Sequence, residues 1–141
     1  MTSHDQWLDL AKRCAKATGL DCDLDIDIAQ TAFPEIGPYV SRCAGDPPMF
    51  WHDPYRKEEC PPFTSSLDAI VSLIEKTLPG YDLLVTKIAG NYEGNIGPEG
   101  SFKAHVGYGK SYALALCQAY CLARAEIAAP QPRDPEDKDT P

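Results

Sequence analysis

The residues best suited to chemistry in this sequence are five consecutive ones, Gly107-Tyr108-Gly109-Lys110-Ser111. They lie between a predicted strand and a predicted helix, where free backbone N–H groups and the helix dipole can receive an anion. A nucleotide-hydrolase P-loop requires G-x4-G-K-[ST], and the residue five positions before Gly109 is Ala104 instead of glycine. The segment therefore predicts an anion-binding turn and disfavours an NTPase. The structural alternative is a plain glycine-rich turn that begins a helix.

Two further segments carry side chains that could contact the same ligand. A glycine-rich loop predicted over 90–100 contains an amide and an aromatic ring suited to covering a ligand, and a tryptophan in a proline-rich segment could stack on a base. Each has a structural alternative, because a long hairpin loop needs glycine and a tryptophan commonly packs on the core. The candidate ligand-binding residues are therefore Gly107, Tyr108, Gly109, Lys110, Ser111, Asn91, Tyr92 and Trp51.

No catalytic residue stands out, because the sequence has neither a Ser–His–Asp order nor an H-E-x-x-H pattern. Cys–His catalysis could use His52 or His105, but nothing in the sequence places either beside a thiol. We expect no catalytic residues.

Metal binding is also not predicted. Of the 6 cysteines only Cys117 and Cys121 are close together, and a zinc site needs a second local pair. The acids of the segment 21–27 lack the mid-loop glycine and the final glutamate of an EF-hand, so they predict a solvated helix face. We expect no metal, no cofactor, and free thiols packed in the core.

Composition limits the partners and the compartment. The chain has 141 residues, 13 Lys+Arg against 21 Asp+Glu and a formal charge of −8, which disfavours binding to nucleic acid polymers. The N-terminus lacks a basic region followed by an apolar run, and no stretch approaches the roughly 18 apolar residues that span a bilayer. We expect a cytoplasmic protein with no membrane partner.

The elements that must position these residues follow from periodicity and breakers. Helices are predicted over about 5–17, 22–32 and 111–128, and another opens at Thr64-Ser65-Ser66-Leu67-Asp68, with Ser65 and Asp68 spaced as a capping box. Strands are predicted over 81–89 and 101–107 as antiparallel neighbours. The helix over 111–128 is apolar almost all round, so its own domain or a second subunit must cover it, and a homo-oligomer is expected.

Proline defines the domain plan. Of the 13 prolines, 7 fall within 34–62, which predicts an irregular segment with at most a short edge strand. The tail over 130–141 holds 4 prolines and 4 acids and is predicted to be flexible. The plan is one α+β domain over 1–129 followed by this tail.

Three stretches of the sequence resemble the phage ABA sandwich domain family, small proteins encoded in phage and prophage genomes. The stretches are Leu10-Ala11-Lys12-Arg13-Cys14-Ala15-Lys16-Ala17-Thr18-Gly19 followed by Leu24-Asp25-Ile26-Asp27-Ile28-Ala29, then Pro62-Phe63-Thr64-Ser65-Ser66-Leu67-Asp68-Ala69, and finally Ala113-Leu114-Ala115-Leu116-Cys117-Gln118-Ala119. The resemblance implies a phage origin and a layered α/β/α sandwich, with a small, mainly antiparallel sheet packed between helices. It implies no catalytic residues.

Three classes of function remain. The first is a non-enzymatic phage protein that binds a small anionic ligand, such as a host defence signalling nucleotide that it sequesters in the host cytoplasm. The alternative is a protein–protein inhibitor or adaptor module of a phage. An enzyme acting on nucleotides comes last, because no complete catalytic motif is present.

Overall fold

The computed structural model describes residues 2–34, 40–41, 49–53, 56–100 and 104–129. Its helices are α1 (Ser3–Lys16), α2 (Cys22–Ala32), α3 (Leu67–Thr77) and α4 (Tyr112–Ala128). Its strands are β1 (Val40–Ser41), β2 (Met49–Asp53), β3 (Arg56–Glu59), β4 (Tyr81–Ile88), β5 (Asn91–Pro98) and β6 (His105–Gly109). The predicted tail over 130–141 lies outside the described residues.

The sheet that carries the candidate site has the strand order β4-β5-β6 and is antiparallel throughout. The prediction of a loop over 90–100 is therefore wrong for most of that range, because β5 occupies it and separates the two strands that were expected to be neighbours. Ala89 and Gly90 both have positive φ and form a two-residue hairpin turn, closed by the pair Ile88 and Asn91. Gly94, one of the glycines that suggested a loop, has a packing role in a strand here, since a Cβ on it would lie 2.8 Å from backbone atoms of α4.

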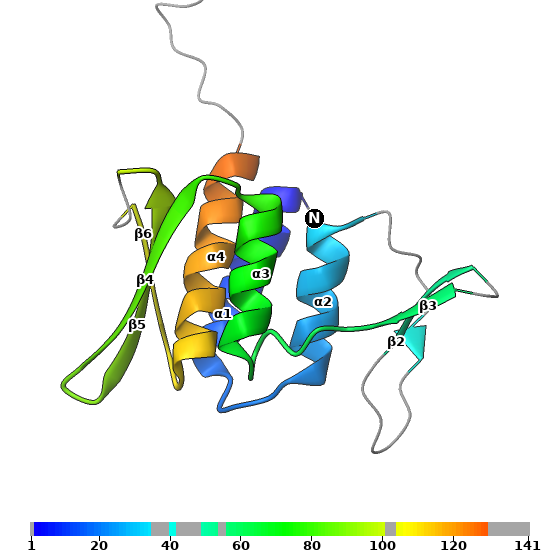
Figure 1. Cartoon of the computed structure of the whole chain (residues 1–141), viewed down its shortest axis with the longest axis horizontal. Coiled ribbons are helices and arrows are strands. Elements are labelled where there is room, and N and C mark those ends of the chain that lie inside the picture. The colour runs from blue at the N-terminus through cyan, green and yellow to red at the C-terminus, as the bar shows by residue number, and fades with distance from the viewer. Residues whose placement is uncertain (1, 35–39, 42–48, 54–55, 101–103, 130–141) are drawn as a thin grey trace, which may run out of the picture.

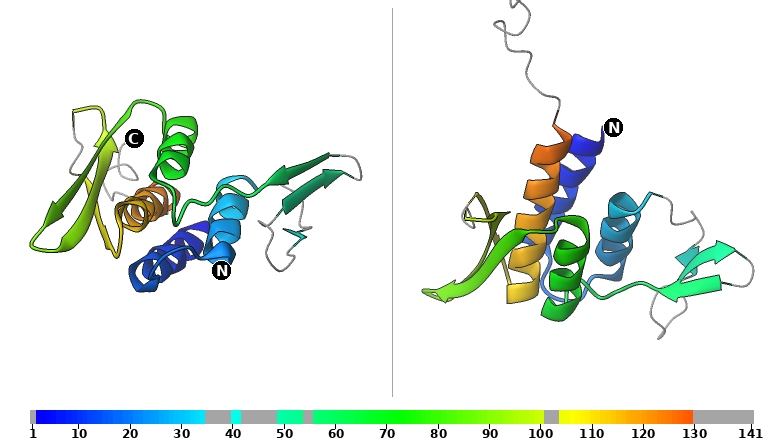
Figure 2. Two further views of the ribbon diagram at one scale, coloured as in Figure 1. Left: turned by 60° about the horizontal axis from the view of Figure 1, so that its bottom comes forward. Right: turned by 45° about the horizontal axis from the view of Figure 1, so that its top comes forward.

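The four helices lie together on one side of this sheet, with α4 directly against it (Figure 1). The predicted α+β class, with helices packed on a small antiparallel sheet, is confirmed. Within that class the order of the layers differs from the expected one. The helices cover one face of the sheet, and β2 and β3 lie beyond the helices, on the side opposite β4–β6 (Figure 2).

The proline-rich range 34–62 contains a second small sheet. Its order is β1-β2-β3, with antiparallel pairing throughout and an irregularity between Trp51 and Asp53. The expected short edge strand is thus present as part of a three-stranded sheet, in a range that was predicted to be irregular. Proline is tolerated there because the prolines lie outside the strand spans themselves.

Helix α4 is the centre of the core. It contacts α1, α3 and all the strands of the β4–β6 sheet, so its apolar sides are covered within the chain. Beside it, Trp7 and Tyr120 meet edge to face at 5.6 Å, and the Arg124 guanidinium lies 4.8 Å above the Trp7 ring. The apolar character of α4 therefore does not require a second subunit.

The acids of α2 are not all solvated. Asp21 caps the helix and Asp27 pairs with Arg13 at 2.6 Å, but Asp25 is only 2% exposed. Its carboxylate accepts the N–H of Thr64 at 2.8 Å, and the hydroxyl oxygen of Thr64 accepts the N–H of Asp21 at 2.8 Å. Asp25 therefore fastens the segment before α3 to α2, and the prediction of a solvated acidic face is wrong for this residue.

Helix α3 begins one residue later than its capping-box pattern suggested. Ser66, not Ser65, is the N-cap, and its side chain accepts the N–H of Ala69 at 3.2 Å. We expect Ser66→Ala to lower the free energy of unfolding by about 1 kcal/mol, as measured by urea denaturation, because it leaves that N–H without its acceptor. Ser72→Ala, at an exposed position of the same helix, is the matched control and should be neutral or slightly stabilising. Equal losses in both variants would contradict the assignment of the cap.

Candidate functional site

The predicted turn over 107–111 is shorter than expected, because Gly107, Tyr108 and Gly109 belong to β6 and only Lys110 and Ser111 join that strand to α4. Ser111 is the N-cap of α4, and its hydroxyl accepts the N–H of Leu114 at 3.1 Å. Ser111 is thus engaged in holding the helix rather than free for a ligand.

The two glycines of the segment have a packing explanation. A Cβ on Gly107 would lie 2.3 Å from the backbone nitrogen of Ala119, and one on Gly109 would lie 2.6 Å from the backbone nitrogen of Ala115. Both glycines let β6 approach the backbone of α4 more closely than a side chain would allow. The two glycines therefore bring β6 close to α4, and they do not form the flexible ligand-binding turn that was predicted.

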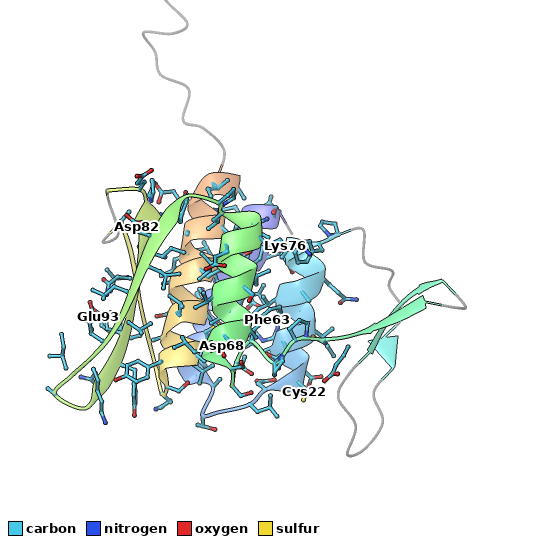
Figure 3. The ribbon with its side chains drawn as sticks, in the orientation of Figure 1. Cys22, Phe63, Asp68, Lys76, Asp82 and Glu93 are labelled. Carbon is cyan, nitrogen blue, oxygen red and sulfur yellow. The ribbon has the colours of Figure 1, made fainter. Side chains whose placement is uncertain are left out.

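Tyr108 points away from this junction. It is 55% exposed and stands opposite Glu93 across the strand pair, on the face of the sheet that the helices do not cover. Figure 3 shows Glu93 and Asp82 on that same side. We call this the outer face, and the predicted set of ligand residues is therefore divided between two faces of the sheet.

On the helix side, side chains from β4, β5 and α4 meet near the N-terminus of α4. Tyr92 is paired with Lys87 on one neighbouring strand and with Gly109 on the other. The Tyr92 ring meets the Tyr112 ring edge to face at 4.8 Å, and the Lys87 ammonium lies 5.0 Å from the centre of the Tyr92 ring. Lys110 is exposed and follows Gly109 directly. We call Lys87, Tyr92, Lys110 and Tyr112 the lysine–tyrosine cluster.

The electrostatics of the lysine–tyrosine cluster favour an anion. The first turn of the 17-residue helix α4 holds no acidic residue, so the positive end of its dipole is not neutralised there. Within the described part of the chain, no hydrogen bond uses the N–H of Tyr112 or Ala113, whereas the N–H groups of Leu114 and Ala115 bond to Ser111. The Lys87 ammonium and two backbone donors therefore lie near one helix end, and the exposed Lys110 precedes that end in the chain.

The remaining predicted ligand residues are placed differently. Asn91 begins β5 beside the hairpin turn and is exposed, one residue from Tyr92. Trp51 belongs to β2, which lies on the far side of the helices from β6, so the fold does not bring its strand to the cluster (Figure 1). Lys87 and Tyr112 were missed by sequence reasoning. Tyr112 carried a signal, since it directly follows the candidate segment, but Lys87 is placed only by the pairing of β4 with β5.

The cysteines behave as core residues. Cys14, Cys60, Cys117 and Cys121 are buried, Cys22 is exposed, and Cys43 lies outside the described residues. Burial raises the pKa of Cys117 and of Cys121 well above the ordinary value for a thiol. His105 is paired with Glu126 at 3.0 Å and not with a thiol. Within the described ranges, no three His, Cys, Asp or Glu side chains are grouped so that they could hold a metal ion.

Comparison with known proteins finds no relative of this chain. The chain matches no family model, no curated protein and no solved structure. Among the residues that the structure describes, no helix is long and apolar enough to cross a membrane.

Proposed function

We propose that this protein binds a small anionic ligand at the lysine–tyrosine cluster. The observation that carries the proposal is the contact of Lys87, Tyr92 and Tyr112 beside the N-terminal end of α4, which Lys110 directly precedes in the chain. Two ammonium groups and a free helix end suit a phosphate or carboxylate, because each supplies donors or positive charge. These groups are local, so they are compatible with a chain of net charge −8 that disfavours long polyanions.

The aromatic pair favours a ligand that carries a ring beside its phosphate. Tyr112 is 38% exposed, which leaves part of its ring open for stacking against a base. We propose a signalling nucleotide of host defence, sequestered without turnover by a phage protein in the host cytoplasm. The phage origin rests on the three stretches similar to the phage ABA sandwich domain family, and the absence of turnover rests on the lack of a complete catalytic motif in the sequence.

Calorimetric titration with a panel of cyclic and ADP-ribose-type nucleotides tests this function. We expect one class of nucleotide to bind with a micromolar or lower Kd, and Lys110→Ala and Lys87→Ala each to weaken binding at least about tenfold, because each removes a charged contact. Lys76→Ala is the matched control, since it removes the same charge from an exposed site at the opposite end of the helices (Figure 3). It should leave Kd within about twofold.

The outcomes separate the three classes of function. Recovery of the bound nucleotide intact supports sequestration, and recovery of a converted product would assign an enzyme instead. No binding at millimolar nucleotide, or equal weakening by Lys110→Ala and Lys76→Ala, would overturn the proposal. Capture of a host or virion protein by the nucleotide-free chain would then favour the inhibitor or adaptor. The exposed apolar side chains of the outer face are the observation that supports this alternative.

A further inference from the structure

We infer that two copies of this chain associate through β4, whose free edge pairs antiparallel with the same edge of the second copy to give one continuous sheet. The inference is independent of the proposed ligand. It rests on the contrast between the two edges of the β4–β6 sheet and on the side chains that a two-fold pairing would bring together.

The β6 edge of the sheet is closed. The N–H of Tyr108 donates to the Gln118 side-chain oxygen at 2.6 Å, and the amide nitrogen of Gln118 donates to the carbonyl oxygen of Ala11 at 3.2 Å. The Gln118 side chain, itself held by α1, therefore takes up the central hydrogen-bonding position on the free side of β6. Natural sheets commonly block an edge in such a way, because a free edge can pair with another chain.

The β4 edge has no such cover among the described residues. The two-residue turn makes Ile88 and Asn91 a hydrogen-bonded pair, so alternate residues of β4 direct their backbone groups away from β5. These residues are Leu83, Val85 and Lys87, with Tyr81 at the start of the strand. Within the described part of the chain, no hydrogen bond uses the N–H of Leu83, Val85 or Lys87 on that side, whereas the N–H of Tyr81 donates to Leu78.

A two-fold axis through Leu84 makes this edge complementary to itself. With Leu84 on the axis, Leu84 lies opposite Leu84 of the second copy and Leu83 lies opposite its Val85. Both contacts are apolar, one on each face of the sheet, since Leu83 and Val85 pack toward the core and Leu84 is 42% exposed on the outer face. Their burial favours association.

The polar side chains of β4 are also matched in this register. Lys87 stands opposite Tyr81 of the second copy and not opposite another lysine, so no like charges face each other. Asp82 stands opposite Thr86 of the second copy. Both side chains are polar, so this register sets neither of them opposite an apolar side chain. In a pairing centred on Val85, Leu83 would instead lie opposite Lys87 of the second copy and Ile88 opposite its Asp82. The observations therefore favour the register centred on Leu84.

A charge-exchange experiment tests both the dimer and its register. We expect the wild-type chain to sediment as a dimer, and Leu84→Lys and Leu84→Glu each to raise the dimer dissociation constant at least about tenfold, because each places like charges at the axis. An equimolar mixture of the two variants should recover the dimer, since lysine then meets glutamate. Ile88→Lys and Ile88→Glu are the matched controls. Ile88 is 60% exposed on the same face but does not meet itself in this register, so these variants should dimerise within about twofold of wild type and gain nothing on mixing.

A second measurement reports the register directly. In a background with the exposed Cys22 and the Cys43 replaced by serine, Leu84→Cys should form an intermolecular disulfide on mild oxidation, because paired Cβ atoms lie about 4.5–5.5 Å apart. Ile88→Cys should not. A wild-type chain that stays monomeric up to millimolar concentration would overturn the inference, as would Leu84 variants that remain dimeric while their far-UV circular dichroism is unchanged. Loss of the dimer without loss of nucleotide binding would separate this interface from the proposed ligand site.

Discussion

Gly107→Ala is expected to lower the free energy of unfolding by about 3 kcal/mol. The added Cβ would lie 2.3 Å from the backbone nitrogen of Ala119 and 2.4 Å from the carbonyl oxygen of Ala115, both in α4. These atoms belong to a buried helix backbone and cannot rotate away as a side chain could, so β6 must move away from α4. Urea denaturation of the purified variant measures the loss.

Gly19→Ala is the matched control for Gly107→Ala. Nothing lies within 4 Å of a Cβ at Gly19, and its φ is outside the left-handed region, so this variant should be neutral or gain up to about 1 kcal/mol. If Gly107→Ala unfolds at the same urea concentration as wild type but no longer binds nucleotide, the glycine serves the ligand instead of the packing, and our explanation of it is wrong.

Asp25→Asn is expected to change how stability depends on pH. Burial raises the pKa of Asp25 from 3.8 to about 6, and the hydrogen bonds from Thr64 only partly oppose that shift. A carboxyl whose pKa is higher in the folded than in the unfolded state stabilises the fold while it is protonated. Its contribution is complete below about pH 4 and is lost as the pH rises through about 6.

The comparison of wild type with Asp25→Asn isolates this contribution from the other acids of the chain. Between pH 4 and pH 8 the wild type should lose on the order of 3 kcal/mol relative to the variant, since each unit of pKa shift corresponds to about 1.4 kcal/mol. Urea denaturation at several pH values measures the difference. Asp68→Asn, at an exposed position in the first turn of α3, controls for the loss of one negative charge. Parallel curves for wild type and Asp25→Asn would contradict the burial of a carboxyl with a raised pKa.

Local sequence determined the helices and most of their ends. Helix α2 has the predicted bounds, and α3 and α4 begin within a residue or two of their predicted caps, because apolar periodicity and capping act over one or two turns. A strand followed directly by α4 was predicted for the same reason, although the strand extends to Gly109 and not to Gly107. The α+β class followed from these elements and their order, and it is confirmed.

The strands were predicted less well, because pairing is not local. β5 carries three glycine or proline positions that suggest a loop when read alone, yet one of them, Gly94, lets the sheet approach α4. The acids of α2 show the same limit. Periodicity cannot tell Asp25 from its neighbours, and only the docking of the segment before α3, through Thr64, buries this one carboxylate.

The candidate site combines both kinds of information. Sequence alone determined that Lys110 and Ser111 stand at the start of an apolar helix, since strand, turn and cap are all encoded within a few residues. Only the tertiary structure decided that Lys87 and Tyr92 lie beside them and that Trp51 does not. Strand register and the packing of the sheet on α4 set these distances, and both depend on contacts between residues far apart in the chain.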